Sequence, residues 1–296
     1  MRYAIITDIH ANFGALQAID NDVRRLRTQG NETIVYWFLG DLVGYGPDPV
    51  ECIKWLKNSA DIDERWVPGN HDEWLLLPTK VSDDAWISLS KHQQALQEPK
   101  NRLYESWFKG EVQKAIQEEA RSLGRIDGEG LEALFVHASL QLSQRRMLYL
   151  HPWKKHLISD IFGLLGREYH KQPTTVLFCG HTHYPMWFHD QQLQPLAYGK
   201  QLPLAEGIHI INPGSVGQPR DGDPRAAYLL FDPEEKTVEF RRVVYEVTAV
   251  ADRLLNNGYP QSLADRLLTA NGKGDLQEFY TVYQRPQWDL DVVAKE

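Results

Sequence analysis

The amino-acid sequence predicts a mixed α/β fold built around a mainly parallel sheet. Two observations support this: short apolar runs rich in β-forming residues recur along the chain, and helical patterns separate the early runs. Near-continuous apolar runs of this length are typical of strands that are buried on both faces. The runs cover residues 3–7, 34–39, 65–68, 134–136 and 176–179.

Helices are predicted between the first strands. Asn12 is a candidate N-cap for a helix that reaches about residue 26, and Pro49 suits the first turn of a helix that ends near residue 57. Strands that alternate with helices predict βαβ units. In such sheets ligands bind beyond the carboxyl ends of the strands.

Two segments interrupt this alternation. Residues 78–122 and 138–172 show helical spacing, and both follow strand ends that carry polar residues. We therefore expect one domain over residues 1–296 with these two segments as caps near the site; the alternative is that they pack beside the core. The last third predicts a strand at 207–211, two antiparallel strands at 226–231 and 238–244 around a turn at 232–235, and helices at 248–257 and 261–270.

Composition excludes several classes of protein. The net charge is −8, from 40 acidic and 32 basic residues, and no long basic tract is present, so we expect no binding of long nucleic acid. No apolar run reaches the roughly 18–20 residues that span a bilayer, and the N-terminus does not resemble a signal peptide. The distant Cys52 and Cys179 do not make a disulfide framework. We therefore expect a cytoplasmic protein without a membrane partner.

Each of the five apolar runs between residues 3 and 179 is followed by side chains that can bind a metal. The pairs in Asp8-x-His10 and His181-x-His183 are two residues apart, and in an extended segment this spacing directs both side chains to the same side. A lone histidine at a strand end is usually structural, so the prediction depends on the whole set. The candidate ligands are Asp8, His10, Asp41, Asn70, His137, His181 and His183.

The chemistry of this set indicates the type of metal. Carboxylate, amide oxygen and imidazole without thiolate suit first-row divalent ions, of which manganese is our first expectation and iron, zinc, nickel and cobalt are alternatives. Seven ligands are too many for one tetrahedral zinc. They suit two ions that share one carboxylate, an arrangement that clamps both ends of a phosphoryl displacement.

The ordered motifs resemble those of the calcineurin-like metallophosphoesterase superfamily. They are Asp8-x-His10, Gly40-Asp41, Gly69-Asn70-His71-Asp72, Val136-His137 and Gly180-His181-x-His183. The resemblance implies a four-layer α/β/β/α fold, with two central β-sheets between helices, and His71 as a catalytic residue that binds no metal. It assigns Asp8, His10, Asp41 and His183 to one ion, and Asp41, Asn70, His137 and His181 to the other.

A closer resemblance covers nearly the whole chain. Residues 40–49 and 212–221 are similar to a compact bacterial and archaeal branch whose members are described as phosphodiesterases or as protein-phosphatase-like. The second motif departs from the superfamily, which often has GDxxD, followed in phosphoprotein phosphatases by Arg. Gly44 and Tyr45 stand at those positions here, which argues against a protein phosphatase and removes the usual acidic partner of His71. We expect Asp48 to replace that partner, while Asp72 is expected to cap the following helix.

Three arginines are candidate substrate contacts. Arg145 and Arg146 follow His137 closely and could clamp a phosphate, although a solvated loop explains them equally well. Arg220 follows a Gly-Ser turn and could reach a substrate phosphate, the alternative being an exposed salt bridge.

These observations predict a hydrolase that acts on a small phosphodiester or a nucleotide, with a phosphomonoester as the next choice. A hydroxide that bridges the two ions would attack phosphorus in line, and His71 would protonate the leaving oxygen. The alternatives are a non-catalytic metal-binding scaffold of the same fold, a serine/threonine protein phosphatase and a nuclease. The acidic composition argues against the nuclease.

Overall fold

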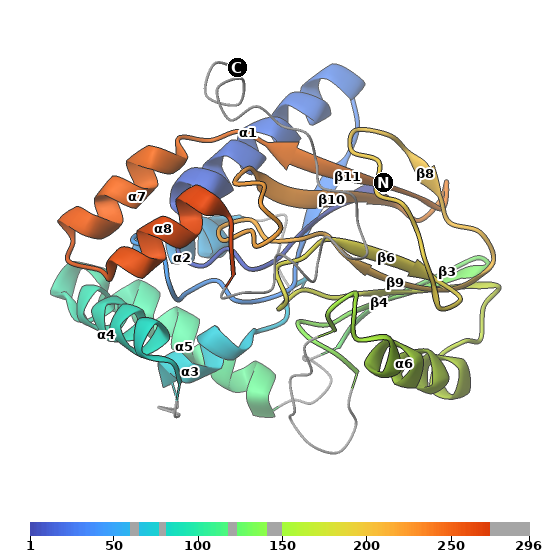
Figure 1. Cartoon of the computed structure of the whole chain (residues 1–296), viewed down its shortest axis with the longest axis horizontal. Helices are drawn as coiled ribbons and strands as arrows, with labels where there is room; N and C mark the ends of the chain where they lie inside the picture. The colour runs from blue at the N-terminus through green and yellow to red at the C-terminus, as the bar shows by residue number, and fades with distance from the viewer. Residues whose placement is uncertain (60–64, 77–80, 118–122, 141–149, 273–296) are drawn as a thin grey trace.

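A computed structural model describes residues 1–59, 65–76, 81–117, 123–140 and 150–272. Two β-sheets lie face to face between layers of helices (Figure 1). The first sheet has the order β2-β1-β10-β11-β8, formed by Ile34–Phe38, Arg2–Ile6, Ala226–Asp232, Thr237–Val243 and Leu202–Pro203. The second has the order β3-β4-β5-β9-β6-β7, formed by Gly124–Gly128, Leu131–Phe135, Thr174–Phe178, Gly207–Asn212, Met186–His189 and Gln192–Leu193.

Eight α-helices and one 3-10 helix are present in the described ranges. Helix α1 begins after Asn12, whose side chain accepts the backbone N–H of Ala15, as its candidate N-cap role predicted. The α-helices are α1 (Phe13–Gly30), α2 (Pro49–Asn58), α3 (Asn70–Leu76), α4 (Asp83–Gln97), α5 (Arg102–Gln117), α6 (Lys155–Glu168), α7 (Val247–Asn256) and α8 (Gln261–Thr269). The 3-10 helix η1 (Pro99–Asn101) joins α4 to α5.

Each apolar strand contributes side chains to two layers of the core, because successive side chains point to opposite faces of the sheet. In β1, Ala4 and Ile6 pack toward α1, while Tyr3 and Ile5 pack between the sheets. The layer between the sheets includes Trp37 stacked on Phe135, with ring centroids 3.8 Å apart. A third cluster joins α6 to the outer face of the second sheet. These three apolar layers confirm the four-layer α/β/β/α fold.

The expectation of a mainly parallel sheet is wrong. Strand β1 pairs with β2 in parallel, and β4, β5 and β9 are parallel to one another. The remaining pairs of named strands are antiparallel, as in β1 with β10 and β6 with β9. Parallel pairing therefore joins the strands that lead to candidate ligands, together with β9, while the other strands add to both sheets in antiparallel pairs. The predicted strand at 65–68 contributes a single bridge, between Phe38 and Trp66.

The two insertions differ in where they pack. Helices α4 and α5 pack against α2 and α3 and extend the core cluster of the first sheet. Helix α6 covers the outer face of the second sheet (Figure 1). Their role as caps over the site stays a prediction.

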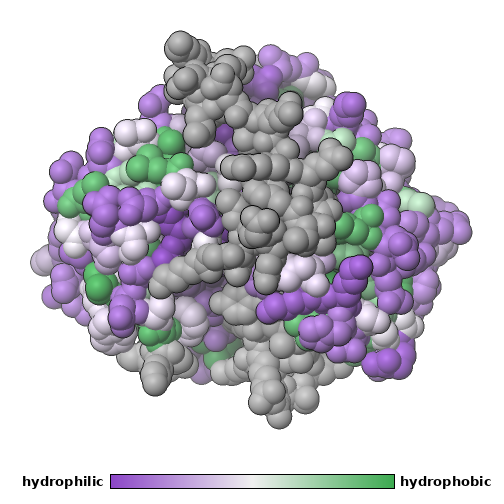
Figure 2. Space-filling model, in the orientation of Figure 1, coloured by the Kyte–Doolittle hydropathy of each residue, from purple (hydrophilic) through white to green (hydrophobic). Residues whose placement is uncertain are grey.

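No helix in the described residues is long and apolar enough to cross a bilayer. In the face that Figure 2 shows, the coloured hydrophobic side chains are scattered among hydrophilic ones.

Candidate metal centre

The candidate ligands meet at one edge of the two sheets. Asp8 follows β1, Asp41 follows β2, His137 follows β4 and His181 follows β5. Because these strands run in parallel pairs within each sheet, their carboxyl ends reach the same edge. All seven side chains are buried, with Asn70, at 5% exposure, the most accessible.

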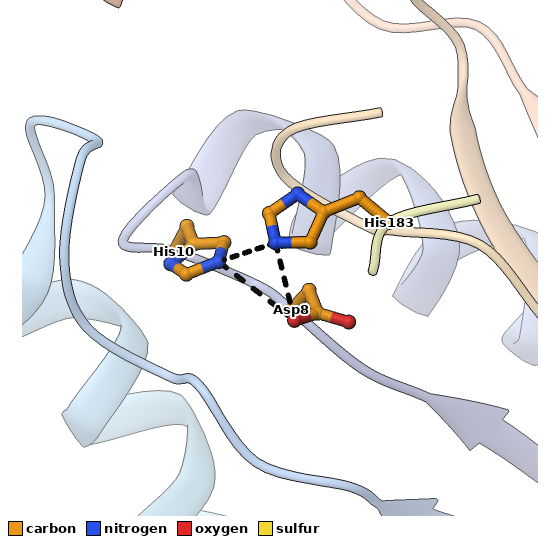
Figure 3. Close-up of side chains that lie close together, drawn as sticks. All are labelled: Asp8, His10 and His183. Carbon is orange, nitrogen blue, oxygen red and sulfur yellow. Dashed lines mark hydrogen bonds and ion pairs between the residues drawn. The ribbon is translucent and has the colours of Figure 1, made fainter. Parts of the chain in front are cut away.

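Asp8, His10 and His183 form the first cluster (Figure 3). Asp8 Oδ1 lies 3.3 Å from His183 Nε2 and 3.8 Å from His10 Nε2. The two Nε2 atoms are themselves 3.0 Å apart. The three ligand atoms therefore surround a space that one ion could fill.

Asp41, His137 and His181 form the second cluster. Asp41 Oδ2 lies 3.3 Å from His137 Nε2 and 3.7 Å from His10 Nε2 of the first cluster. His137 Nε2 also lies 3.2 Å from Asn70 Oδ1. Asp41 thus faces both clusters, which is the position required of a carboxylate shared by two ions.

The donor set of the first cluster fits a cation rather than an internal hydrogen bond. His10 Nδ1 faces the Val43 carbonyl at 3.0 Å, and His183 Nδ1 faces the Gln218 carbonyl at 2.6 Å. A carbonyl oxygen only accepts, so both Nδ1 atoms carry the proton and both Nε2 atoms present lone pairs. Burial lowers the pKa of both rings, so neither gains a second proton at neutral pH. Two lone pairs 3.0 Å apart repel each other, and a cation bound by both nitrogens would remove that repulsion.

His137 shows the same orientation with a different charge state. Its Nδ1 lies 2.7 Å from the Leu39 carbonyl, which again directs Nε2 toward Asp41. Burial opposes protonation, but Asp41 outweighs it and raises the pKa of His137 to about 9. Without a metal, a proton on Nε2 therefore satisfies Asp41; a metal ion would replace that proton.

The ligand loops adopt a backbone that side chains rarely take. Asp8, His10, Asp41, His181 and His183 all have positive φ values, between 48° and 68°. Such residues cost of order 1–3 kcal/mol each and concentrate at functional sites. The expectation that Asp8-x-His10 and His181-x-His183 are extended is therefore wrong. The left-handed turns direct His181 to the second cluster and His183 to the first.

Asp72 holds the loop that carries Asp41. Its buried carboxylate accepts the backbone N–H groups of Gly69, Asp41 and Leu42, each at 2.9 Å, and of Val43 at 3.2 Å. The bond from Gly69, just before α3, agrees with the expected capping role of Asp72. The other three bonds were not predicted, because their donors lie about 30 residues away in sequence.

His71 lies beside both the first cluster and the shared carboxylate. Its ring centroid is 4.8 Å from that of His10, and its backbone N–H donates to Asp41 Oδ1 at 2.8 Å. A Cβ atom at Gly44 would lie 2.2 Å from His71 Nδ1, so the ring fills the space that a side chain there would need. Burial lowers the pKa of His71 to about 4, which favours a neutral ring with one N–H.

The expected replacement of the acidic partner of His71 by Asp48 is wrong. Asp48 accepts a hydrogen bond from Arg253 of α7 at 2.7 Å. His71 Nδ1 has no hydrogen-bond partner among the described residues. The ring is instead surrounded by aromatic groups, with Tyr45 at 4.5 Å and Trp74 at 4.7 Å between centroids.

The predicted arginines divide into two groups. Arg145 and Arg146 lie outside the described residues. Arg220 lies close enough to the centre that its charge adds to burial in lowering the pKa of His10, His71 and His181.

We predict that replacing Asp72 with alanine destabilises the fold. The four amide groups that it accepts would lose their acceptor, and each buried unsatisfied N–H costs roughly 1–3 kcal/mol, so the free energy of unfolding should fall by about 3 kcal/mol or more. Urea denaturation of the metal-free protein measures this. Asp83→Ala, at the exposed start of α4, is the matched control. A loss below about 1 kcal/mol for Asp72→Ala would contradict the anchoring role.

Known proteins share this fold and much of this sequence. The family model of the calcineurin-like phosphoesterase superfamily domain matches residues 1–236. The uncharacterised protein MJ0912 of Methanocaldococcus jannaschii is 30% identical over 267 residues, which cover 89% of this chain and 96% of the relative. The crystal structure of a metallophosphoesterase from Sphaerobacter thermophilus is 28% identical and has a TM-score of 0.67, covering 91% of this chain and all of the other.

A second solved structure shows similarity of fold alone. The hypothetical protein PH1004 of Pyrococcus horikoshii is 18% identical, with a TM-score of 0.66 and coverage of 92% of this chain and 99% of its own. The motifs, the two sheets and the family match agree. The chain belongs to the calcineurin-like phosphoesterase superfamily, a family of metal-dependent hydrolases.

Proposed function

We propose that this protein hydrolyses a small phosphodiester or a nucleotide at a centre of two divalent metal ions, with a phosphomonoester as the next choice of substrate. The observation that supports this best is the pair of buried clusters that meet at Asp41. Two ions at such a centre would neutralise phosphoryl oxygens and activate water at neutral pH. Manganese is the ion that we expect first.

The proposed ligand sets follow the two clusters. Three imidazoles have a proton on Nδ1 that is held by a backbone carbonyl, which leaves Nε2 for the metal. The first ion would be held by Asp8, His10, Asp41 and His183, and the second by Asp41, Asn70, His137 and His181.

We propose that His71 acts on the leaving group of the substrate. It lies beside His10 and Asp41 but is held in place by its neighbours, and its single ring N–H is available to the oxygen that departs. Through that N–H the neutral ring would hydrogen-bond the departing oxygen. To act as a general acid it would first take up a second proton as imidazolium, pass that proton to the leaving oxygen and return to the neutral imidazole. No described carboxylate bonds to Nδ1, so packing by Tyr45 and Trp74 orients the ring instead.

The alternatives have less support. A serine/threonine protein phosphatase is disfavoured because Gly44 and Tyr45 stand where such enzymes have the second Asp of GDxxD and the Arg that follows it. His71 forms a third group of possible ligands with His10 and Asp41, but the two clusters already use both of those residues. A metal-binding scaffold would have little use for His71, which favours catalysis. A nuclease for long nucleic acid is disfavoured by the net charge of −8.

The direct test is hydrolysis by the full chain after removal of metal and reloading with manganese. We expect turnover of bis-aryl phosphates, cyclic nucleotides or dinucleoside polyphosphates to exceed that of aryl phosphate. A chelator should abolish it, since the ligands alone cannot activate water. A fully loaded protein that turns over none of these compounds would support the scaffold instead.

Asp41→Ala should remove both metal ions. The two cations would lose the shared negative charge between them and would repel each other. Elemental analysis after dialysis should find about two ions per chain in the wild type, as in two-metal sites generally, and close to none in the variant. Asp190→Ala, an exposed acid near a surface turn, is the control and should keep both. One ion or none in the loaded wild type would overturn the two-metal proposal.

His71→Ala should keep the metals and lose rate. A general acid is typically worth about 10²–10⁴-fold, so turnover of substrates with poor leaving groups should fall by that amount. The loss should shrink for nitrophenyl esters, whose leaving groups need no proton. Wild-type turnover of a poor-leaving-group substrate by the metal-loaded variant would exclude this role, and loss of metal would reassign His71 as a ligand.

A further inference from the structure

Tyr45 is held at the centre in a strained backbone conformation. Its φ is +59°, which is uncommon for a tyrosine, and its ring lies 4.7 Å from that of His10 and 4.5 Å from that of His71. Strain of this kind persists only where the surroundings enforce it. The surroundings here come from segments outside the metal-binding motifs.

The insertion helix α4 provides the first of these segments. The backbone N–H of Tyr45 donates to Ser88 Oγ at 3.0 Å, and that of Gly44 donates to His92 Nδ1 at 3.2 Å. The other ring nitrogen of His92 donates to the Gly46 carbonyl at 2.7 Å. Both side chains are fully buried, so α4 fixes the backbone on either side of Tyr45. This gives the 78–122 insertion a direct contact with the site.

Arg220 approaches the same place from the loop after β9. The loop is tied to the first ligand segment, because the N–H groups of Val216 and Gly217 donate to the carbonyls of Thr7 and Asp8, both at 3.0 Å. The guanidinium donates to Gln218 Oε1 at 3.2 Å. Its buried Nε has no hydrogen-bond partner among the described residues. The neighbouring Asp221 pairs with Arg242 instead.

The C-terminal segment, beyond the 1–236 family match, supports both side chains. Arg266 of α8 lies over the Tyr45 ring at 5.6 Å and pairs with Asp84 of α4 at 2.7 Å. The backbone of Gly272 packs on Arg220, because a Cβ atom there would lie 2.9 Å from Arg220 Cδ. Burial raises the pKa of Tyr45, and the Arg220 charge offsets part of that increase, which agrees with their proximity.

An arginine beside two metal clusters needs an anion. Once cations fill the clusters, the guanidinium is repelled unless a negative group lies between them. The guanidinium of Arg220 lies near the site, and its buried Nε–H has no hydrogen-bond acceptor among the described residues. A planar fork of this kind matches the oxygens of a phosphoryl group.

We propose that Arg220 and Tyr45 together bind the phosphoryl group of the substrate, and that α4 and the C-terminal segment 266–272 hold them in position. This rests on the proposed function for the reaction, but anion binding can be measured without turnover. The pair would recognise the phosphoryl oxygens rather than the leaving group. Its loss should therefore affect every phosphate ester to a similar extent, unlike the loss of His71.

The test measures orthophosphate binding to the manganese-loaded full chain by calorimetry, together with kcat/KM for aryl and bis-aryl phosphates. Arg220→Gln should weaken both by about 10–100-fold, the usual effect of losing a charge-assisted hydrogen bond, with the metal content unchanged. Tyr45→Phe, which keeps the ring packing, should weaken both by about 3–10-fold, as for one neutral hydrogen bond. Gly272→Ala should displace the Arg220 stem and weaken both without altering any charge.

Arg253→Gln is the matched control, because it removes a half-exposed arginine that pairs with Asp48 outside the centre, and it should leave orthophosphate binding unchanged. If loaded Arg220→Gln bound orthophosphate as tightly as the wild type, the proposal would be overturned. A loaded wild type that binds no orthophosphate would also overturn it. A wild type that binds orthophosphate through Arg220 but hydrolyses no ester would leave the anion site standing and refute only the proposed reaction.

Discussion

The structure depends on the electrostatics of its buried centre. Two carboxylates and four imidazoles converge where the sheets meet, and the His10 and His183 rings point Nε2 lone pairs at each other across 3.0 Å. Burying charged and polar groups without partners is costly, so cations bound at this centre would stabilise the arrangement. The surrounding loops are organised to keep these ligand atoms directed inward despite that cost.

Backbone groups fix the orientation of many of these side chains. The carbonyls of Leu39, Val43 and Gln218 each hold one imidazole by its Nδ1, which fixes both the tautomer and the angle of the ring. Asp72 gathers four amide groups from the segments around Asp41. Ligand positions of this kind are set before a metal arrives, which reduces the entropy lost on binding.

The parts of the chain that differ most from the shared motifs are also connected to the centre. Helix α4 bonds the loop at Gly44, and α8 reaches α4 through Arg266 and Asp84. The missing acid of the second motif is explained locally, because the His71 ring occupies the volume that a side chain at position 44 would need. The candidate ligands thus lie together at the centre, while packing by neighbouring segments decides how His71 is held.

Much of the fold and ligand set could be predicted from local patterns. The strands, α1, α2 and the ligand types after each strand follow from apolar periodicity, capping residues and metal preference, which are properties of short segments. Asp8, His10 and Asp41 were recognised in this way, and the ordered motifs indicated the two-sheet architecture through resemblance. The antiparallel pair of β10 and β11 was also predicted, from the turn that joins them. The antiparallel pairing of β10 with β1 and of β6 with β9 was missed, because pairing depends on partners far along the chain.

The sequence by itself determined which residues could bind metal and where the strands would deliver them, because ligand chemistry and strand periodicity are local. Only the tertiary structure decided which ligands share a cluster, since His10 and His183 are 173 residues apart. It also decided the left-handed turns, the surroundings of His71 and the approach of Arg220 to Tyr45. These features arise from packing between distant segments, and packing selects among backbone conformations that local sequence leaves open.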